Sequence, residues 1–224
     1  ILGDGCLNLQ NMNGYVSLHT THKKHIRDWI LDYFNAKVIK CREEIKGNTT
    51  RIYWCKTVNL PFRYSDVYNT QGEKYCQSRW LNLPLEKSKY ILKGLLDTDG
   101  SNLKELVFDS TSYNLIECVR FICLKLGLLT SGYQRDRIGE SHITKNNSVI
   151  TNKKLSWCLR IPRTEAICDL LNIEYKSHFF KFFRYQDYLL TRIETITDET
   201  YEGTLYDLQM KEEHNYLLHQ GLVH

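Results

Sequence analysis

Apolar residues recur at helical spacing in two separate segments of the chain. They are Ile26, Trp29, Ile30, Tyr33 and Phe34 in residues 19–38, and Leu115, Val119, Ile122 and Leu126 in residues 109–129. This spacing predicts one helix in each segment. Ser112 stands where an N-cap is expected and Gly127 where a C-cap is expected, which strengthens the second prediction.

A strand-like segment follows each predicted helix, RIYWCKTV at 51–58 and KLSWCLRI at 154–161. Side chains alternate across a strand, so Trp54 and Trp157 can both point to a core. The opposite face would then carry the polar and aromatic residues Arg51, Tyr53, Lys154, Ser156 and Arg160. An apolar pair running into Asp-Gly precedes each helix, in ILGDGCLN at 1–8 and LLDTDGSN at 95–102. The chain thus reads as two similar halves, each with the order helix end, strands, helix, strands, helix.

The acidic end of the second motif, ILKGLLDTDGS at 91–101, is electrostatically unusual. Asp97 and Asp99 lie where a helix would end, and a helix C-terminus already carries a partial negative charge. Gly94 and Thr98 are small and lie on one side of that helix, so another segment can approach closely there. If that segment ends at Gly3, then Asp4 and Asp99 meet, and a divalent cation between them would offset their repulsion.

Two simpler interpretations of D-T-D-G were considered. Counting a calcium loop from Asp97 places Asn102 at the turn glycine and Phe108 at the bidentate glutamate, so the EF-hand pattern fails. A glycine-terminated helix with solvated acids is the common alternative for any single Asp-Gly. The second copy of the motif favours a functional site.

Composition indicates an ordered protein of one large or two small domains. Hydrophobic residues make up 42% and charged residues 25%, with three prolines. No apolar run approaches membrane-spanning length. Eight scattered cysteines without a C-x-x-C pair favour reduced thiols and an intracellular location, cytoplasmic or nucleoid-associated. The net charge is only +4, but basic residues cluster in residues 37–56 and 135–160.

KGLLDTDG at 93–100 resembles the LAGLIDADG motif of homing endonucleases, and ILGDG at 1–5 resembles the tail of a first copy. The resemblance implies an α+β fold with a pseudo-twofold αββαββα repeat, divided into residues 1–90 and 91–190. It also implies a monomer that binds double-stranded DNA and cuts both strands with Mg²⁺ or Mn²⁺. By motif position, Asp4 and Asp99 are the metal-binding, catalytic acids. Asp97 is secondary, because Leu2 stands at its position in the first copy.

The family commonly adds one lysine from each repeat. Lys74 lies 70 residues after Asp4 and Lys176 lies 77 after Asp99, so both are predicted to be catalytic. A saddle of strands on DNA implies phosphate and base contacts. The predicted DNA-binding residues are Arg42, Arg51, Arg135, Arg137, Lys154 and Arg160. The alternative for each of these residues is a solvated surface charge.

The segment after about residue 190, TRIETIT, TLYDLQM and HNYLLHQGLVH, resembles the C-terminal splicing segment of inteins. The resemblance implies a small all-β segment at 191–224 in which Asp207 supports the acyl shift, His214 assists asparagine cyclisation and His224 polarises the scissile carbonyl. The asparagine expected after His224 and the N-terminal splicing blocks are not in the chain, so splicing would need a missing N-terminal intein portion, from a truncated or a split intein. The alternative for the histidines is an ordinary surface hairpin.

The prediction is therefore an intein-encoded endonuclease joined to part of a splicing domain. Two alternatives stay open. One is a cleavage-inactive, maturase-like domain that binds DNA or RNA, and the other is a structural insert that only aids splicing.

Overall fold

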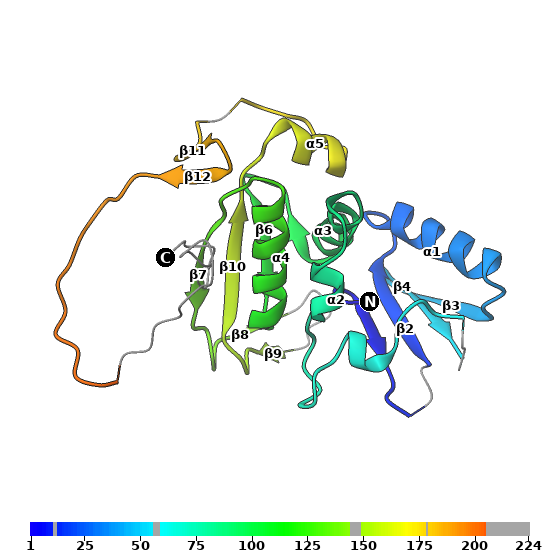
Figure 1. Ribbon diagram of the computed structural model, residues 1–224. Helices are drawn as coiled ribbons and strands as arrows, with labels where there is room; N and C mark the ends of the chain where they lie inside the picture. The colour runs from blue at the N-terminus through cyan, green and yellow to red at the C-terminus, as the bar shows by residue number, and fades with distance from the viewer. Residues whose placement is uncertain (11–12, 56–58, 144–148, 178, 205–224) are drawn as a thin grey trace.

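The computed structural model describes residues 1–10, 13–55, 59–143, 149–177 and 179–204. Its first part is an antiparallel sheet of order β1-β2-β4-β3. Its strands are β1 (Gly5–Leu7), β2 (Gly14–His19), β3 (Cys41–Lys46) and β4 (Thr49–Trp54). Helix α1 (Lys24–Ala36) joins β2 to β3 and packs on this sheet through buried Phe34, next to Trp54. Figure 1 shows this sheet at the right, in blue.

A second antiparallel sheet has the order β5-β6-β10-β7, which places strands as in the first sheet. Its strands are β5 (Gly100–Ser101), β6 (Leu106–Ser110), β7 (Ser131–Arg135) and β10 (Ser156–Ile161). Helix α4 (Tyr113–Lys125) covers it with a row of buried residues that includes Leu115, Val119 and Ile122. The Ser112 side chain accepts a hydrogen bond from Leu115 N, which confirms the predicted N-cap. Gly127 has φ +74° directly after the helix, where a residue without a Cβ ends it most easily.

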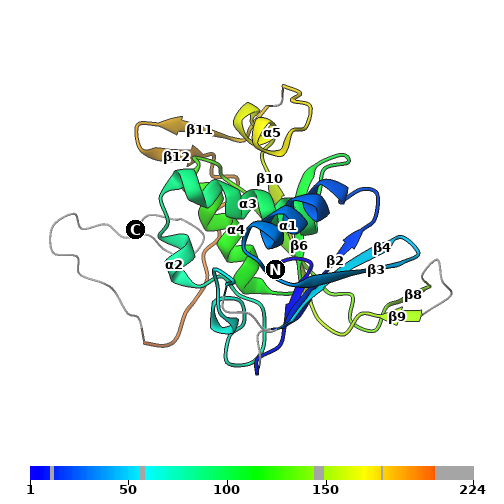
Figure 2. The same ribbon diagram turned by 90° about the vertical axis from the view of Figure 1, so that its right-hand side faces the viewer.

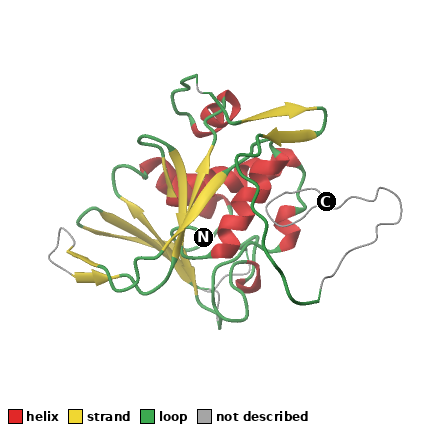
Figure 3. Cartoon of the chain, turned by 90° about the vertical axis from the view of Figure 1, so that its left-hand side faces the viewer, coloured by secondary structure: helices red, strands yellow, loops and turns green. Residues whose placement is uncertain are grey.

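Helix α3 (Leu85–Asp99) lies between the two halves and beside α4 (Figure 1). It buries Leu92, Leu95 and Leu96 in the core of the second half. It begins at Leu85, directly after the N-cap residue Pro84, and so starts before the expected boundary at residue 91. Trp80 and Leu81 of the short helix α2 (Ser78–Leu81) pack on the same core. Figure 3 shows the helices gathered on one side of the strands.

The remaining elements are short and peripheral. They are the 3-10 helix η1 (Tyr64–Asp66), the hairpin β8 (Ser141–Ile143) and β9 (Val149–Thr151), helix α5 (Glu165–Leu171), and the hairpin β11 (Phe182–Tyr185) and β12 (Tyr188–Thr191). Figure 2 shows the β3–β4 and β8–β9 hairpins projecting to the same side. No helix in the described part of the chain has the length and apolarity needed to cross a bilayer.

One apolar residue of a predicted helix lies outside the core, and one expectation differs from the structure. Trp29 has 66% of its surface exposed and stacks on Tyr33, because it lies on the outer face of α1. The TRIETIT segment forms a strand only as far as Thr191, and residues 192–204 form none. A strand must satisfy its backbone groups through a partner, and these residues have no partner strand within the described part of the chain.

Candidate active site

The two Asp-Gly motifs meet in the centre of the molecule. Residues 2–4 form a turn closed by the hydrogen bond from Gly5 N to Ile1 O at 3.2 Å. A Cβ atom on Gly3 would lie 2.0 Å from Thr98 Oγ1, so only glycine allows this approach. The expected close approach therefore occurs at Thr98. An added Cβ on Gly94, one turn earlier, has no described atom within 4 Å.

Asp99, the last residue of α3, lies close to Asp4. Burial raises the pKa of the Asp99 carboxyl, and the negative charge of Asp4 raises it further. The positive charges of Lys74 and Lys23 act in the opposite direction but do not cancel the effect. Gly100 follows Asp99. A Cβ atom on Gly100 would lie 2.3 Å from Leu96 O, so the chain can leave the helix this tightly only at glycine.

Lys74 reaches the same centre from the loop that links the halves. Its Nζ donates a hydrogen bond to Gly3 O, and its own carbonyl accepts one from Ser112 Oγ. Burial lowers the pKa of the Lys74 ammonium, while the charges of Asp99 and Asp4 oppose that change. The predicted lysine of the first half thus lies beside both predicted acids.

Lys23 is a site residue that motif reasoning missed. Its Nζ donates to Asp4 Oδ2 and to Thr98 O, both at 2.5 Å, so it links the two halves. A signal existed in the sequence, where the basic run HTTHKKH (19–25) begins at the last residue of β2. Ser17 N donates a hydrogen bond to Asp4 O at 3.1 Å, which brings the end of β2 and the basic run after it close to Asp4. The sequence alone did not fix the register of β2.

The structure does not bring Lys176 to the acids. Its side chain is 65% exposed on the segment after α5, and it pairs with Glu174 at 3.4 Å. Its catalytic role stays a prediction without support from contacts. Asp97 also points elsewhere, since it pairs with Lys93 of the same helix at 2.8 Å.

The oxygen atoms around Asp4 and Asp99 suit a hard divalent cation. Two carboxylates stand beside the carbonyl oxygens of Gly3 and Thr98, and such oxygens are the donors that Mg²⁺ and Ca²⁺ prefer. Lys23 donates to Asp4 Oδ2 and Thr98 O, and Lys74 donates to Gly3 O. These two ammonium groups supply positive charge where a metal cation would supply it. Among the described residues, no cluster of three or more His, Cys, Asp or Glu side chains is placed to hold a metal. Carbonyls, water or substrate would complete the coordination.

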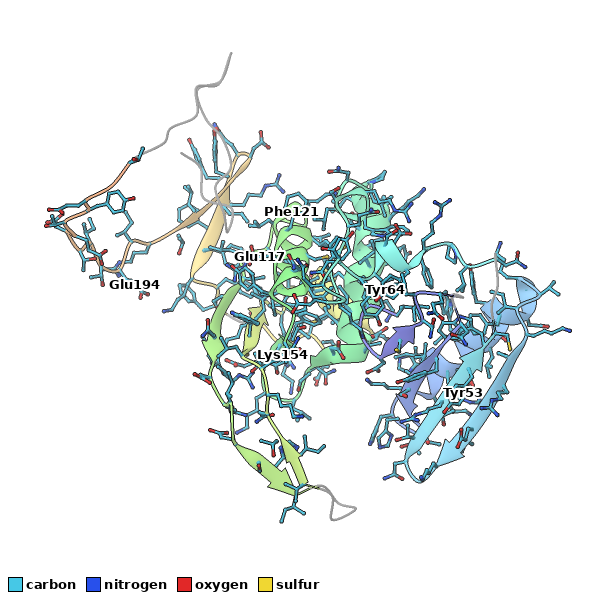
Figure 4. All side chains as sticks on the ribbon, turned by 90° about the horizontal axis from the view of Figure 1, so that it is seen from below. Tyr53, Tyr64, Glu117, Phe121, Lys154 and Glu194 are labelled. Carbon is cyan, nitrogen blue, oxygen red and sulfur yellow. The ribbon has the colours of Figure 1, made fainter. Side chains whose placement is uncertain are left out.

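The faces of the sheets turned away from the helices carry arginines over tyrosines. In the first sheet, Arg42 lies 4.8 Å from the Tyr53 ring centroid, and Arg51 donates to Ser17 Oγ at 3.1 Å. Figure 4 shows Tyr53 on this sheet and Lys154 at the other. Neighbouring side chains therefore hold Arg42 and Arg51 on the open face of the first sheet.

In the second sheet, Arg135 and Arg160 lie 5.5 and 5.4 Å from the Tyr133 ring centroid. Arg135 pairs with Asp109, and Arg160 pairs with Glu105 at 2.9 Å. The two other predicted residues, Arg137 and Lys154, are exposed in the segment between β7 and β10. Lys154 also lies 3.4 Å from Glu73. All six predicted DNA-binding residues thus lie on these strands or in the segment between β7 and β10, and five of them contact acids or tyrosines.

The predicted splicing residues Asp207, His214 and His224 lie outside the described residues. Their proposed roles keep only the sequence resemblance as support.

The arrangement of two antiparallel sheets and one layer of helices is a mixed α/β fold that resembles a solved homing endonuclease. The particular likeness is to mesophilic variants of I-DmoI, with a TM-score of 0.50 and 15% identity over 78% of this chain and 92% of that one. I-DmoI in complex with DNA and Mn gives a TM-score of 0.47 and 15% identity, covering 80% of this chain and 93% of that one. At such identity the likeness concerns the fold.

One curated protein also matches, the ATP-dependent DNA helicase Hel308 of Methanocaldococcus jannaschii. The identity is 29% over 96 residues, which are 42% of this chain and 8% of the helicase. The chain thus spans less than a tenth of that relative. No family model matches the chain.

Proposed function

We propose that this protein is a site-specific DNA endonuclease that cuts both strands of its target in a reaction dependent on Mg²⁺ or Mn²⁺. The observation that carries the proposal is the meeting of Asp4 and Asp99 at the Gly3–Thr98 contact, with two lysine ammonium groups on the surrounding oxygens. Two acids held this close are destabilised without a cation, which is a common feature of functional sites.

Hydrolysis of a phosphodiester needs an activated water and stabilisation of the charge that develops on the phosphate. A bound divalent metal supplies both. Asp4 and Asp99, with the carbonyls of Gly3 and Thr98, would hold it. Lys23 and Lys74 are placed to shift from these oxygens to the incoming phosphate, where their charge would stabilise the transition state.

We also propose that the two halves are related by a pseudo-twofold axis through the acid pair. The equivalent strand orders support this proposal. Each sheet would follow half of the double-stranded target, so one monomer would contact both half-sites. The arginines on the open faces, Arg42, Arg51, Arg135 and Arg160, supply the charge that such a surface needs.

The intein origin is part of the proposal and rests on the sequence of residues 191–224. Splicing would require the N-terminal intein portion as a partner. We place the protein inside the cell, in the cytoplasm or at the nucleoid, because all eight cysteines are free and five are buried as thiols.

The test begins with DNA from the host gene without its insert. Gel-shift measurements and plasmid cleavage with Mg²⁺ or Mn²⁺ should show specific retention and a double-strand cut. Retention without a cut under either metal would contradict the nuclease and favour the binding-only alternative. Absence of specific retention would favour a structural insert of the intein.

A further inference from the structure

We propose that His19 is a positioning residue that holds Lys23 on the Asp4–Asp99 site. This inference deepens the proposed function and rests on it. His19 ends β2 with its side chain on the open face of the sheet, because Val16 and Leu18 point into the core. Only the turn 20–22 separates it from Lys23.

The His19 ring accepts hydrogen bonds from that turn. Its Nδ1 lies 3.3 Å from Thr21 N and 3.3 Å from His22 N, and 3.2 Å from Thr21 Oγ1. Two backbone N–H groups point at this atom, so Nδ1 is the acceptor and the ring proton is on Nε2. The His22 ring covers His19 at a centroid distance of 4.4 Å.

These bonds fix the turn that precedes helix α1. Lys23 is the N-cap residue of α1, and its side chain makes no capping hydrogen bond. The imidazole accepts from Thr21 N and His22 N, which precede the N-cap residue, so it orders the turn that leads into the helix. The turn is anchored on both sides, by Lys23 N to His19 O at 3.1 Å and by Thr20 N to Asn48 O at 2.9 Å.

The consequence falls on the Lys23 ammonium. It reaches both Asp4 Oδ2 and Thr98 O only while its backbone stays at this place in the turn. Without the imidazole, residues 20–22 lose their side-chain acceptor. The backbone of Lys23, from which its flexible side chain extends, is then no longer held in place. An asparagine side chain offers a carbonyl oxygen at nearly the position of Nδ1, so it can replace the acceptor.

The first test is a double-mutant cycle on single-turnover DNA cleavage. We expect His19→Ala to slow cleavage by about 10- to 100-fold, the usual effect of a misplaced catalytic group. His19→Asn should restore most of the rate. In a Lys23→Met background, His19→Ala should add less than about a twofold loss. Full additivity of the two effects, or failure of His19→Asn to rescue, would overturn the proposal.

Two further readouts do not depend on cleavage. Titration of DNA-free protein with Mn²⁺ should show tighter binding for Lys23→Met, because the ammonium competes for Asp4, and a change in the same direction for His19→Ala. An unchanged affinity in His19→Ala beside a changed one in Lys23→Met would overturn the proposal. ¹⁵N NMR of the His19 ring should place the proton on Nε2, and a proton on Nδ1 would contradict it. If wild type cleaves no DNA, the proposed function fails, while these two readouts still decide the role of His19.

Discussion

Gly3 approaches Thr98 so closely that a methyl group on Gly3 would lie 2.0 Å from the Thr98 hydroxyl oxygen and 3.2 Å from Asp99 Oδ2. Because Asp4 follows Gly3 and Asp99 follows Thr98, this single contact sets the separation of the two acids. The neighbouring Leu2 packs against the cores of both halves. The geometry of the site thus depends on packing between the halves.

Gly3→Ala should push the halves apart and cost about 1 to 3 kcal/mol of unfolding free energy, the usual effect of overpacking. Urea denaturation would measure it, and the rate of DNA cleavage should fall as well. Gly94→Ala is the matched control in the same region. Nothing described lies within 4 Å of its Cβ, so alanine should stabilise α3 of this chain by about 0.5 to 1 kcal/mol. Equal behaviour of the two variants would contradict the contact.

Asp99→Asn should make the metal-free protein more stable at pH 7. The folded-state pKa of Asp99 is raised, so the folded protein binds more protons between the ordinary and the raised value. Stability is therefore lost as pH rises through that window and stays lower above it. Calorimetry with EDTA should give a higher Tm for the asparagine variant. A lower Tm would show that Lys23 and Lys74 outweigh the burial of the charge.

Added Mn²⁺ should make wild type more stable than Asp99→Asn. Wild type gains about 2.7 kcal/mol when the metal is at 100 times its Kd, and the variant with one carboxylate fewer gains less.

Substitution of the three candidate lysines should have different effects on the rate of DNA cleavage. Lys74→Met and Lys23→Met each remove an ammonium beside the acids and should slow cleavage by roughly 100-fold or more. Lys176→Met removes an exposed charge and should change the rate by less than about threefold. Single-turnover assays at saturating DNA would measure this difference. A large loss in Lys176→Met alone would restore the role predicted from its sequence position.

The proximity of Asp4 and Asp99 could be predicted from the sequence because its signal is local. Asp4 and Asp99 stand in copied Asp-Gly motifs, and glycine is needed at both for close backbone approach. Ser112 and Gly127 were equally readable as helix caps.

The lysines were harder to predict because their positions depend on long-range register. Counting from the motif indicates Lys74, which lies beside Asp4 and Asp99 in the structure. The same count indicates Lys176, which pairs with Glu174 on the segment after α5, so its role stays a prediction. Lys23 was missed because only the pairing of β1 with β2 brings it back to Asp4. Trp29 fits the helical period but lies outside the core, which the period alone cannot distinguish.

Arg160 should contribute to DNA affinity through charge. Arg160→Ala should weaken binding and lower the slope of log K against log salt by about 0.9, the value for one phosphate contact. Glu105→Gln removes the acid that now pairs with Arg160 and should strengthen binding. Lys89→Ala is the control, since Lys89 pairs with Glu86 on the helical side. Fluorescence anisotropy at several salt concentrations would measure all three, and an unchanged slope for Arg160→Ala would refute the contact.

The second sheet should cover more DNA than the first. Residues 47–48 join β3 to β4 after the pair Lys46–Thr49, whereas residues 136–155 join β7 to β10 after the equivalent pair Arg135–Ser156. Replacing 136–155 with Gly-Asn, as in the first sheet, should shorten the footprint on one side by about 3 base pairs. That figure follows from the three residues of β8 at roughly 3.3 Å each. Hydroxyl-radical footprinting would detect this change, and an unchanged footprint would show that the hairpin does not contact DNA.

Asp4 and Asp99 are expected to act together in cutting DNA. The most direct measurement is cleavage of a plasmid that carries the uninterrupted host site, with Mg²⁺ or Mn²⁺, by wild type, Asp4→Asn, Asp99→Asn and Asp97→Asn. We expect linear product from wild type and from Asp97→Asn, whose carboxylate pairs with Lys93. The other two variants should lose at least about 1,000-fold in cleavage rate at unchanged DNA affinity. Undiminished cutting by Asp99→Asn, or cutting that persists in EDTA, would contradict this expectation.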